Sequence, residues 1–368
     1  MKRNILAVLA VSAMTFGLAA CNENLGNSSN TGSSDSAIAS NDSSSSNTDF
    51  DATKGISTYN RDTTSGTRDG FFTKIGAEDA KSNDTLLASG FVTVTSNGDM
   101  MAKVAADEYG IGYSSLADLT NSVKALSVNG VVASNETVKD GTYTLQRNFN
   151  YVHKALDLTK VHDALIQSYV SFAFSTEGIA IIEGDGGILE DTALQNSKPW
   201  AQVIADASNA TWVNTLGLTA TGATNTAIAS ETINFTGSTS VEPISTALSS
   251  AWSSVFGANK PTVNHNHTGS GAAFTTLADG TGDIGFASRD FNESETGSHP
   301  DYVTGRICRD AICPIVNTAN PLDDITVTEL RGIFINARAF TDAAWAEENF
   351  GTTFEGESAI TEWSALID

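Results

Sequence analysis

From residue 55 onward, two kinds of hydrophobic pattern alternate along the chain. Short runs rich in β-branched and aromatic residues are typical of strands, and they cover 55–61, 90–96, 110–116, 232–240 and 282–291. Segments in which apolar residues recur every three or four positions are typical of helices, and they cover 65–75, 98–109, 160–175, 240–257 and 326–334. Alternation of this kind predicts an α/β protein built on open sheets.

The stretch 187–231 interrupts the alternation. It is less regular and ends in an Ala- and Thr-rich segment, so we interpret it as a connector with some local helix. One α/β series, 56–186, precedes it and a second, 232–368, follows it. The length of 368 residues suits one large two-lobed domain or two small ones.

The N-terminus has the pattern of a targeting segment. Residues 1–20 combine Lys and Arg with an apolar stretch that is short for a membrane span, as in signal peptides. The sequence Leu18-Ala19-Ala20-Cys21 resembles a bacterial lipobox, which predicts lipidation of Cys21; the alternative is an ordinary signal peptide with a chance cysteine. Residues 21–55 are rich in Ser and Asn and nearly free of apolar residues at first, as expected for a disordered tether.

Composition narrows the possible partners. Hydrophobic residues make up 40% of the chain, enough for a substantial core, and the formal net charge is −23. No basic patch is evident in the sequence, and such a negative surface repels nucleic acid, so we expect no nucleic-acid partner.

Two cysteines remain in the folded part, Cys308 and Cys313. Outside the cytoplasm we expect them to form a short-loop disulfide, with free buried thiols as the alternative. Zinc would need further ligands nearby in the sequence, and His265 and His267 lie in an Asn-rich loop that we expect to be exposed. We therefore predict no metal site.

Three predicted helices begin with small hydroxyl residues, at Ser65-Gly66-Thr67, Thr239-Ser240 and Ser270-Gly271. A helix N-terminus offers unpaired N–H groups and the positive end of a dipole, so it attracts anions. Arg61 adds a guanidinium that matches a tetrahedral oxyanion. Each feature alone is typical of an ordinary helix cap; the set indicates an anion site.

Several motifs together resemble those of the phosphate-binding proteins of ABC transporters. The motifs are YNRDTTSGTRDGF (59–71), GSTSVEPI (237–244), GSGAAFTTLADGTGDIGFASRD (269–290) and ITEWS (360–364). The run Arg-x-x-x-Ser-Gly-Thr is the most specific of them. The resemblance implies a two-lobed periplasmic-binding-protein (type II) fold with the ligand cleft between the lobes, and no cofactor.

The resemblance also implies which residues bind phosphate. The anion would be held by residues with hydroxyl, backbone N–H or guanidinium donors, namely Arg61, Ser65, Gly66, Thr67, Thr239, Ser240 and Ser270. Many members have an aspartate after the Asp-Ile-Gly strand that accepts the phosphate proton. In this chain Ser288, Arg289 and Asp290 occupy that region, so the identity of the acceptor, and the rejection of sulfate, stay open.

The order of the motifs departs from the family's usual order, in which the GSTS half comes first. The halves are therefore predicted to be circularly permuted, with 187–231 joining the original ends. Permutation requires that the original termini lie close together and that the new break falls in an exposed loop. We expect a monomer, with a domain-swapped dimer as the alternative.

Taken together, these features predict a lipid-anchored extracytoplasmic receptor that captures inorganic phosphate and delivers it to the transmembrane subunits of an ABC permease. The alternative is a phosphate sensor or surface interaction protein on the same fold. We predict no enzymatic activity, because the sequence has no nucleophile-elbow motif. Affinity, and selectivity against sulfate or arsenate, do not follow from the sequence.

Overall fold

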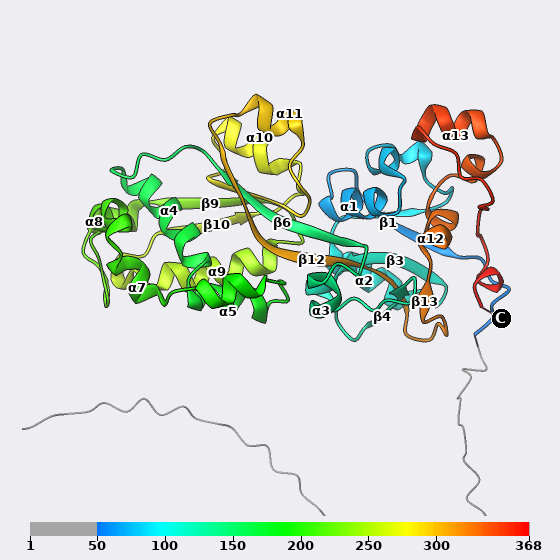
Figure 1. Ribbon diagram of the computed structural model, residues 1–368, viewed down its shortest axis with the longest axis horizontal. Helices are drawn as coiled ribbons and strands as arrows, with labels where there is room; N and C mark the ends of the chain where they lie inside the picture. Colours follow the sequence, from blue (N-terminus) through cyan, green and yellow to red (C-terminus); the bar gives the residue numbers. More distant parts are fainter. Residues whose placement is uncertain (1–49, 368) are drawn as a thin grey trace, which may run out of the picture. The chain divides into compact units, whose positions relative to one another are not determined.

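The computed structural model describes residues 50–367, which fall within one folded unit (Figure 1). The predicted signal peptide, Cys21 and most of the predicted tether lie outside the described residues. Among the residues described, no single helix is long and apolar enough to cross a membrane. One bent helix pair, Val161–Ala173 with Thr176–Gly184, meets the length and composition of a span, but its Leu165 and Ile179 are buried in a core.

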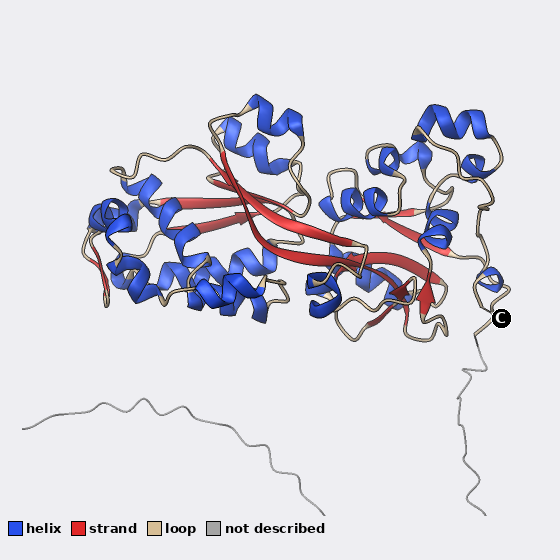
Figure 2. Cartoon of the chain, in the orientation of Figure 1, coloured by secondary structure: helices blue, strands red, loops and turns tan. Residues whose placement is uncertain are grey.

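Strands from both predicted α/β series join in one nine-stranded sheet (Figure 2). The strands follow the order β10-β9-β11-β6-β12-β3-β1-β2, with β4 paired beside β12. In this order they are Thr262–Asn266, Thr232–Gly237, Ile284–Ala287, Gln146–His153, Val303–Asn317, Gly110–Ser115, Ser57–Arg61 and Val92–Val94, and β4 is Val123–Ala125. Parallel pairs lie at both ends of this order, and β6 and β12 are antiparallel to their neighbours.

The strands β6 and β12 connect two lobes, each with its own hydrophobic core. One core draws on residues 59–145 and 311–363 with Ile188, and the other on residues 149–308. We name them the Arg61 lobe and the Thr239 lobe. The long strand β12 pairs with β6 as far as Ala311 and with β3 from Ile312 onward, so it passes from one core to the other. These two strands connect the lobes, and we refer to them as the hinge strands.

Helices cover the sheet in each lobe, as Figure 1 shows. In the Arg61 lobe they are α1 Gly66–Lys74, α2 Asn97–Ala106, α3 Asn135–Lys139, α12 Val327–Phe334 and α13 Ala343–Phe350. In the Thr239 lobe they are α4 Val161–Ala173, α5 Thr176–Gly184, α9 Glu242–Ser254, α10 Ala272–Asp279 and α11 Glu293–Ser298. The structure thus confirms the predicted fold class, an α/β protein with two lobes.

The predicted connector contains more helix than its sequence pattern indicated. It forms α6 Asp191–Asn196, α7 Trp200–Ala205, α8 Ala210–Leu216 and a hairpin of β7 Leu218–Thr219 and β8 Gly222–Ala223. Trp200 and Trp212 stack with ring centroids 5.9 Å apart inside the core of the Thr239 lobe. The segment is thus an integral part of that lobe.

The structure contradicts the expected disulfide between Cys308 and Cys313, because both are free buried thiols. They lie five residues apart on the continuous strand β12, a separation of roughly 16 Å in an extended chain, whereas a disulfide needs Cα atoms within about 7 Å. Cys308 belongs to the core of the Thr239 lobe and Cys313 to that of the Arg61 lobe. Burial raises the pKa of both thiols, so they remain protonated.

The two ends of the described chain lie side by side. Gly55 forms an antiparallel bridge with Glu362, the Ile56 N–H donates to the Thr361 carbonyl at 2.8 Å, and the Trp363 N–H donates to the Lys54 carbonyl at 3.2 Å. The fully buried Trp363 packs against Phe50, with ring centroids 5.9 Å apart. The ITEWS motif and the beginning of β1 are therefore neighbours in space.

Candidate functional site

The first part of the site is the turn between β1 and α1. Arg61 is the last residue of β1, and Ser65 caps α1 by accepting hydrogen bonds from the backbone N–H groups of Thr67 and Arg68. Gly66 faces the other lobe: a β-carbon at this position would lie 2.1 Å from Ser270 Oγ and 2.4 Å from Ser288 Oγ. Only glycine fits there, because no larger residue lets α1 approach these serines so closely.

The second part is a group of buried serines in the Thr239 lobe. Ser238 Oγ donates to Ser288 Oγ at 2.9 Å, Ser270 Oγ lies 3.3 Å from Ser288 Oγ, and the Ser240 N–H donates to Ser238 Oγ at 3.1 Å. Each of these serines is at most 1% exposed. The helices that follow, α9 and α10, have no side-chain cap. The Ala272 and Ala273 N–H groups of α10 donate to the carbonyls of Gly269 and Ser270, so α9 is the helix whose first N–H group is available to an anion.

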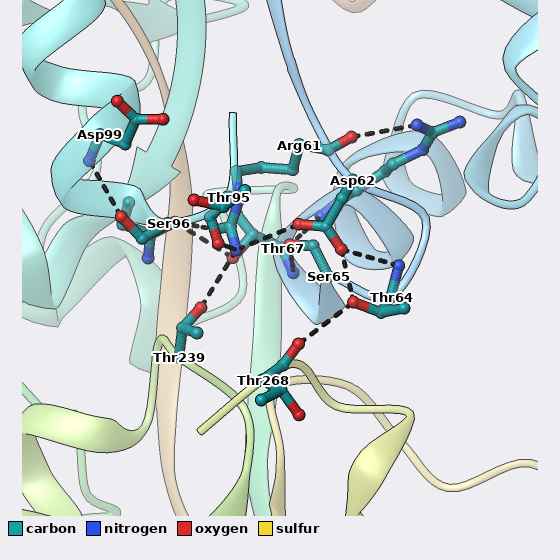
Figure 3. Close-up of polar contacts among 12 residues, drawn as sticks. Arg61, Asp62, Thr64, Ser65, Thr67, Thr95, Ser96, Asp99, Thr239 and Thr268 are labelled. Carbon is teal, nitrogen blue, oxygen red and sulfur yellow. Dashed lines mark hydrogen bonds and ion pairs between the residues drawn. The ribbon is translucent and has the colours of Figure 1, made fainter. Parts of the chain in front are cut away.

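The two parts touch directly across the lobes (Figure 3). Arg61 Nη2 donates to Thr239 Oγ1 at 3.1 Å, and the hydroxyls of Thr67 and Ser240 share a hydrogen bond of 2.7 Å. Thr64 Oγ1, beside them, donates to the Thr268 carbonyl at 3.2 Å. Residues 173 to 204 positions apart in sequence thus meet at one place.

Arg61 is 1% exposed and incompletely neutralised. Its Nη1 donates to Asn97 Oδ1 at 2.6 Å and its Nη2 donates to the Thr95 carbonyl at 3.0 Å, while the buried Nε has no hydrogen-bond partner. The nearest carboxylate, that of Asp62, lies 3.9 Å from Nη2. Burial lowers the pKa of the Arg61 guanidinium, yet an arginine stays charged in a protein. A buried cation of this kind favours an anionic partner.

Sequence reasoning missed Asn97, which lies at the centre of these contacts. Besides accepting from Arg61, its Nδ2 donates to Ser240 Oγ at 3.0 Å and to Asp118 Oδ2 at 2.6 Å. Burial raises the pKa of Asp118 to about 6. A signal was present: Ser96 caps α2 through the Asp99 N–H, so a fourth helix with a hydroxyl start follows a strand there.

The predicted residues Arg289 and Asp290 lie apart from the serines. The Arg289 guanidinium pairs with Glu295 at 2.7 Å and with Asp69 of the other lobe at 3.0 Å. Asp290 accepts hydrogen bonds from Asn148 and Asn150 on β6, at 2.8 and 3.2 Å. Ser288, in contrast, is part of the serine group. The structure therefore brings together Arg61, Thr67, Gly66, Thr239, Ser240, Ser270 and Ser288, with Ser65 as the cap of α1.

The two histidines of the Asn-rich segment are half-buried, contrary to the expected exposure; His265 lies on β10 and His267 directly follows it. They are hydrogen-bonded to each other at 3.1 Å, and His267 Nδ1 lies 3.0 Å from the Ser238 carbonyl. Burial lowers the pKa of His267 to about 4, so the ring is neutral and supports the Ser238 turn. Within residues 50–367, no group of three or more His, Cys, Asp or Glu side chains is arranged to hold a metal ion.

Two α/β lobes joined by crossing strands, with helix N-termini from each lobe meeting between them, define the class of two-lobed periplasmic-binding proteins. Residues 220–365 match a family model described as a PBP superfamily domain. The chain is 30% identical over 302 residues to Phosphate-binding protein PstS 2 of Streptococcus agalactiae serotype V, covering 81% of this chain and 89% of that protein. It is also 30% identical over 284 residues to Phosphate-binding protein PstS 2 of Streptococcus pneumoniae serotype 4, covering 76% and 84%. The chain belongs to the family of phosphate-binding proteins, as its motifs predicted.

The fold agrees with a solved member. The crystal structure of a phosphate ABC transporter, phosphate-binding protein from Streptococcus pneumoniae TIGR4 superposes with a TM-score of 0.55. It is 24% identical and the match covers 85% of this chain and 100% of that chain. This similarity supports the fold, and the family follows from the sequence relatives.

Proposed function

We propose that this protein captures inorganic phosphate between its two lobes and delivers it to an ABC permease. The observation that carries the proposal is the meeting of Arg61 and Thr67 of one lobe with Thr239 and Ser240 of the other. Hydroxyls that bond to each other across the lobes are also placed to bond to the oxygens of one tetrahedral anion. The N-termini of α1, α9 and α10 add fixed positive dipoles.

The negative net charge does not oppose this function. Short-range hydrogen bonds and local dipoles determine affinity, whereas the overall field mainly affects the rate of encounter. Binding would hold the lobes together, and the permease would recognise the closed form. In the proposed set, Arg61, Thr67, Thr239, Ser240, Ser270 and Ser288 act as donors to the anion, and Gly66 offers its backbone N–H, whereas the Ser65 N–H donates to the Asp62 carbonyl.

Calorimetry tests the proposal directly. We expect the full chain to bind phosphate with one site per molecule, and to bind arsenate, which has the same shape and protonation. A chain that binds none of phosphate, arsenate and sulfate would contradict the proposal. Because the protein is proposed to bind phosphate without converting it, incubation with a phosphate ester should release no phosphate.

We also propose that the receptor is held outside the cytoplasm by lipid on Cys21. The lipobox-like sequence and the polar segment after it support this. Mass spectrometry of the native N-terminus should find acyl chains on Cys21, and an unmodified N-terminus further along the chain would contradict the anchor. We propose further that the halves are permuted within one chain; the bridge between Gly55 and Glu362 supports this, since it places together the two segments that an unpermuted order would make continuous.

A further inference from the structure

A second cavity lies between the lobes, beside the hinge strands, and many of its lining side chains are cationic. Its volume is about 510 Å³, within the range of small-molecule sites. The floor comes from β6 and β12, one wall from α1 and the short helix Glu78–Lys81, and the other wall from the loop after β11. All three parts contribute cations, which are Lys74, Lys81, Arg147, Arg289, Arg306 and Arg309.

Three carboxylates line the cavity, those of Asp69, Glu78 and Asp290, and three more, those of Glu190, Glu295 and Asp310, form ion pairs with its arginines. The chain as a whole has 20 Lys and Arg against 43 Asp and Glu, so six cations against six carboxylates make this cavity far less negative than the rest of the protein. In an acidic protein, a cavity this rich in cations is a place where an anion meets little repulsion.

Several of these cations have donors to spare. The Arg147 side chain is 2% exposed; its Nε and Nη2 donate to Asp310 Oδ2, while its buried Nη1 has no hydrogen-bond partner. Arg306 and Arg309 share the single carboxylate of Glu190, at 3.3 and 2.6 Å. Lys74 forms no ion pair with any described residue.

We propose that this cavity is a second anion site, separate from the Arg61–Thr239 site, and that it binds a condensed phosphate such as pyrophosphate. A single phosphate contacts one group of donors, whereas the cations here stand on opposite walls and on the floor, as suits an anion with two linked phosphoryl groups. Arginine binds phosphoryl oxygens through paired hydrogen bonds, and the side-chain amides of Gln146, Asn148 and Asn292 supply further donors.

The walls of the cavity belong to different lobes, so its occupation is coupled to closure. An anion that bridges Lys74 of the Arg61 lobe and Arg306 on hinge strand β12 favours the closed form. By linkage, a ligand that closes the lobes at the Arg61–Thr239 site then strengthens binding in the cavity, and the converse also holds.

The test is a calorimetric titration of the full chain with pyrophosphate, with and without excess inorganic phosphate. We expect saturable pyrophosphate binding that persists in excess phosphate. The double variant Lys74→Gln/Arg306→Gln changes two cations that are not buried, so it should fold, and it should lose at least about tenfold in pyrophosphate affinity. Its affinity for inorganic phosphate alone, measured separately, should change less than about twofold.

The matched control is Lys103→Gln/Arg338→Gln, which removes the same two residue types outside the cavity. It should bind pyrophosphate as the unmodified chain does. Three results would each overturn the proposal: pyrophosphate affinity that falls in proportion to added phosphate, equal losses in the two double variants, or sulfate binding to the cavity as tightly as pyrophosphate. The separate phosphate titration keeps a failure here distinct from a failure of the proposed phosphate function.

Discussion

The guanidinium of Arg61 in one lobe donates to the hydroxyl of Thr239 in the other at 3.1 Å, and its own Nε remains without a partner. This contact links the end of β1 to the turn before α9, two places where a strand leads into a helix. A guanidinium that contacts both lobes and has one N–H donor without a partner is suited to hold an oxyanion between them.

Removal of Arg61 should therefore have the largest effect on phosphate binding. Each charge-assisted hydrogen bond contributes about 1.5–3 kcal/mol, so we expect Arg61→Ala to weaken binding about tenfold to hundredfold in calorimetry. Arg61→Lys keeps the positive charge but loses the paired donors of the guanidinium. Its phosphate affinity should therefore lie between that of Arg61→Ala and that of the unmodified protein. Arg338→Ala, an exposed arginine in the same lobe, is the control. Unchanged affinity in a folded Arg61→Ala protein would mean that the site has been placed wrongly.

Gly66 should control the closure of the lobes. In Gly66→Ala the new methyl group would meet Ser270 and Ser288 at less than 2.5 Å, so α1 has to withdraw from the serines. We expect phosphate affinity to fall at least about tenfold, since each cross-lobe contact lengthens. The thermal stability of the lobes should change little.

The control for this glycine is Gly184→Ala at the end of α5, where a β-carbon meets no atom within 4 Å. If Gly66→Ala binds phosphate as tightly as Gly184→Ala does, the close approach of α1 to the serines is not needed for binding.

Arg289 is predicted to act in closure through its ion pair with Asp69. Glu295 holds the guanidinium in the Thr239 lobe, and Asp69 receives it from the Arg61 lobe at 3.0 Å. A partly exposed pair of this kind contributes about 0.2–1 kcal/mol, so Asp69→Asn should reduce phosphate affinity by no more than about fivefold. Asp79→Asn, an exposed carboxylate nearby, should leave affinity unchanged. A hundredfold loss in Asp69→Asn would instead show a direct role in binding.

The sequence can predict those features of the site that depend only on residues close together in the chain. The turns at Ser65, Thr239 and Ser270 were predictable because each lies within one strand-to-helix connection. Asn97 was missed because its role depends on contacts with Arg61, Asp118 and Ser240, from three other segments.

The disulfide was predicted wrongly for a similar reason. The spacing of Cys308 and Cys313 suits a short loop, but the segment is one strand that runs through two cores, and that path depends on the long-range pairing with β6 and β3. The α/β class, in contrast, follows from the alternation of strand-like and helix-like hydrophobic patterns, which each segment of the sequence shows by itself.

His162 should make stability depend on pH in the alkaline range. Hydrogen bonds to Asp283 and then to Glu231, at 3.0 and 2.9 Å, raise its pKa to about 9. A folded-state pKa above the unfolded value means that the protonated ring stabilises the fold. This stabilisation is complete below about pH 6.5 and is lost as the pH rises through about 9.

The variant His162→Gln isolates this contribution. In urea unfolding, it should be less stable than the unmodified protein at pH 6, and the difference should shrink by pH 10. A difference that stays constant across this range would show that the ring acts through packing and not through its charge.

The last prediction concerns the order of the halves. The bridge between Gly55 and Glu362 and the packing of Phe50 on Trp363 place the two ends of the folded chain together, so a direct link between them should cost little. A rearranged gene that encodes residues 231–367, a short Gly-Ser linker and then residues 50–230 reverses the order of the halves, which this chain shares with the Streptococcus agalactiae relative over 302 aligned residues. The new break falls beside the exposed Ser230, one residue before the end of the connector, whose tryptophans stay attached to the Thr239 lobe.

We expect the rearranged protein to be a monomer that binds one phosphate per chain with an affinity within about twofold of the original, because every cross-lobe contact is kept. Size-exclusion chromatography with light scattering, followed by calorimetry, measures both quantities. A swapped dimer predicts a different outcome: the original chain would elute at twice its mass, and the rearrangement would change its assembly. A monomer that folds but binds no phosphate would show that the contacts at the Gly55–Glu362 junction do more than join the two halves.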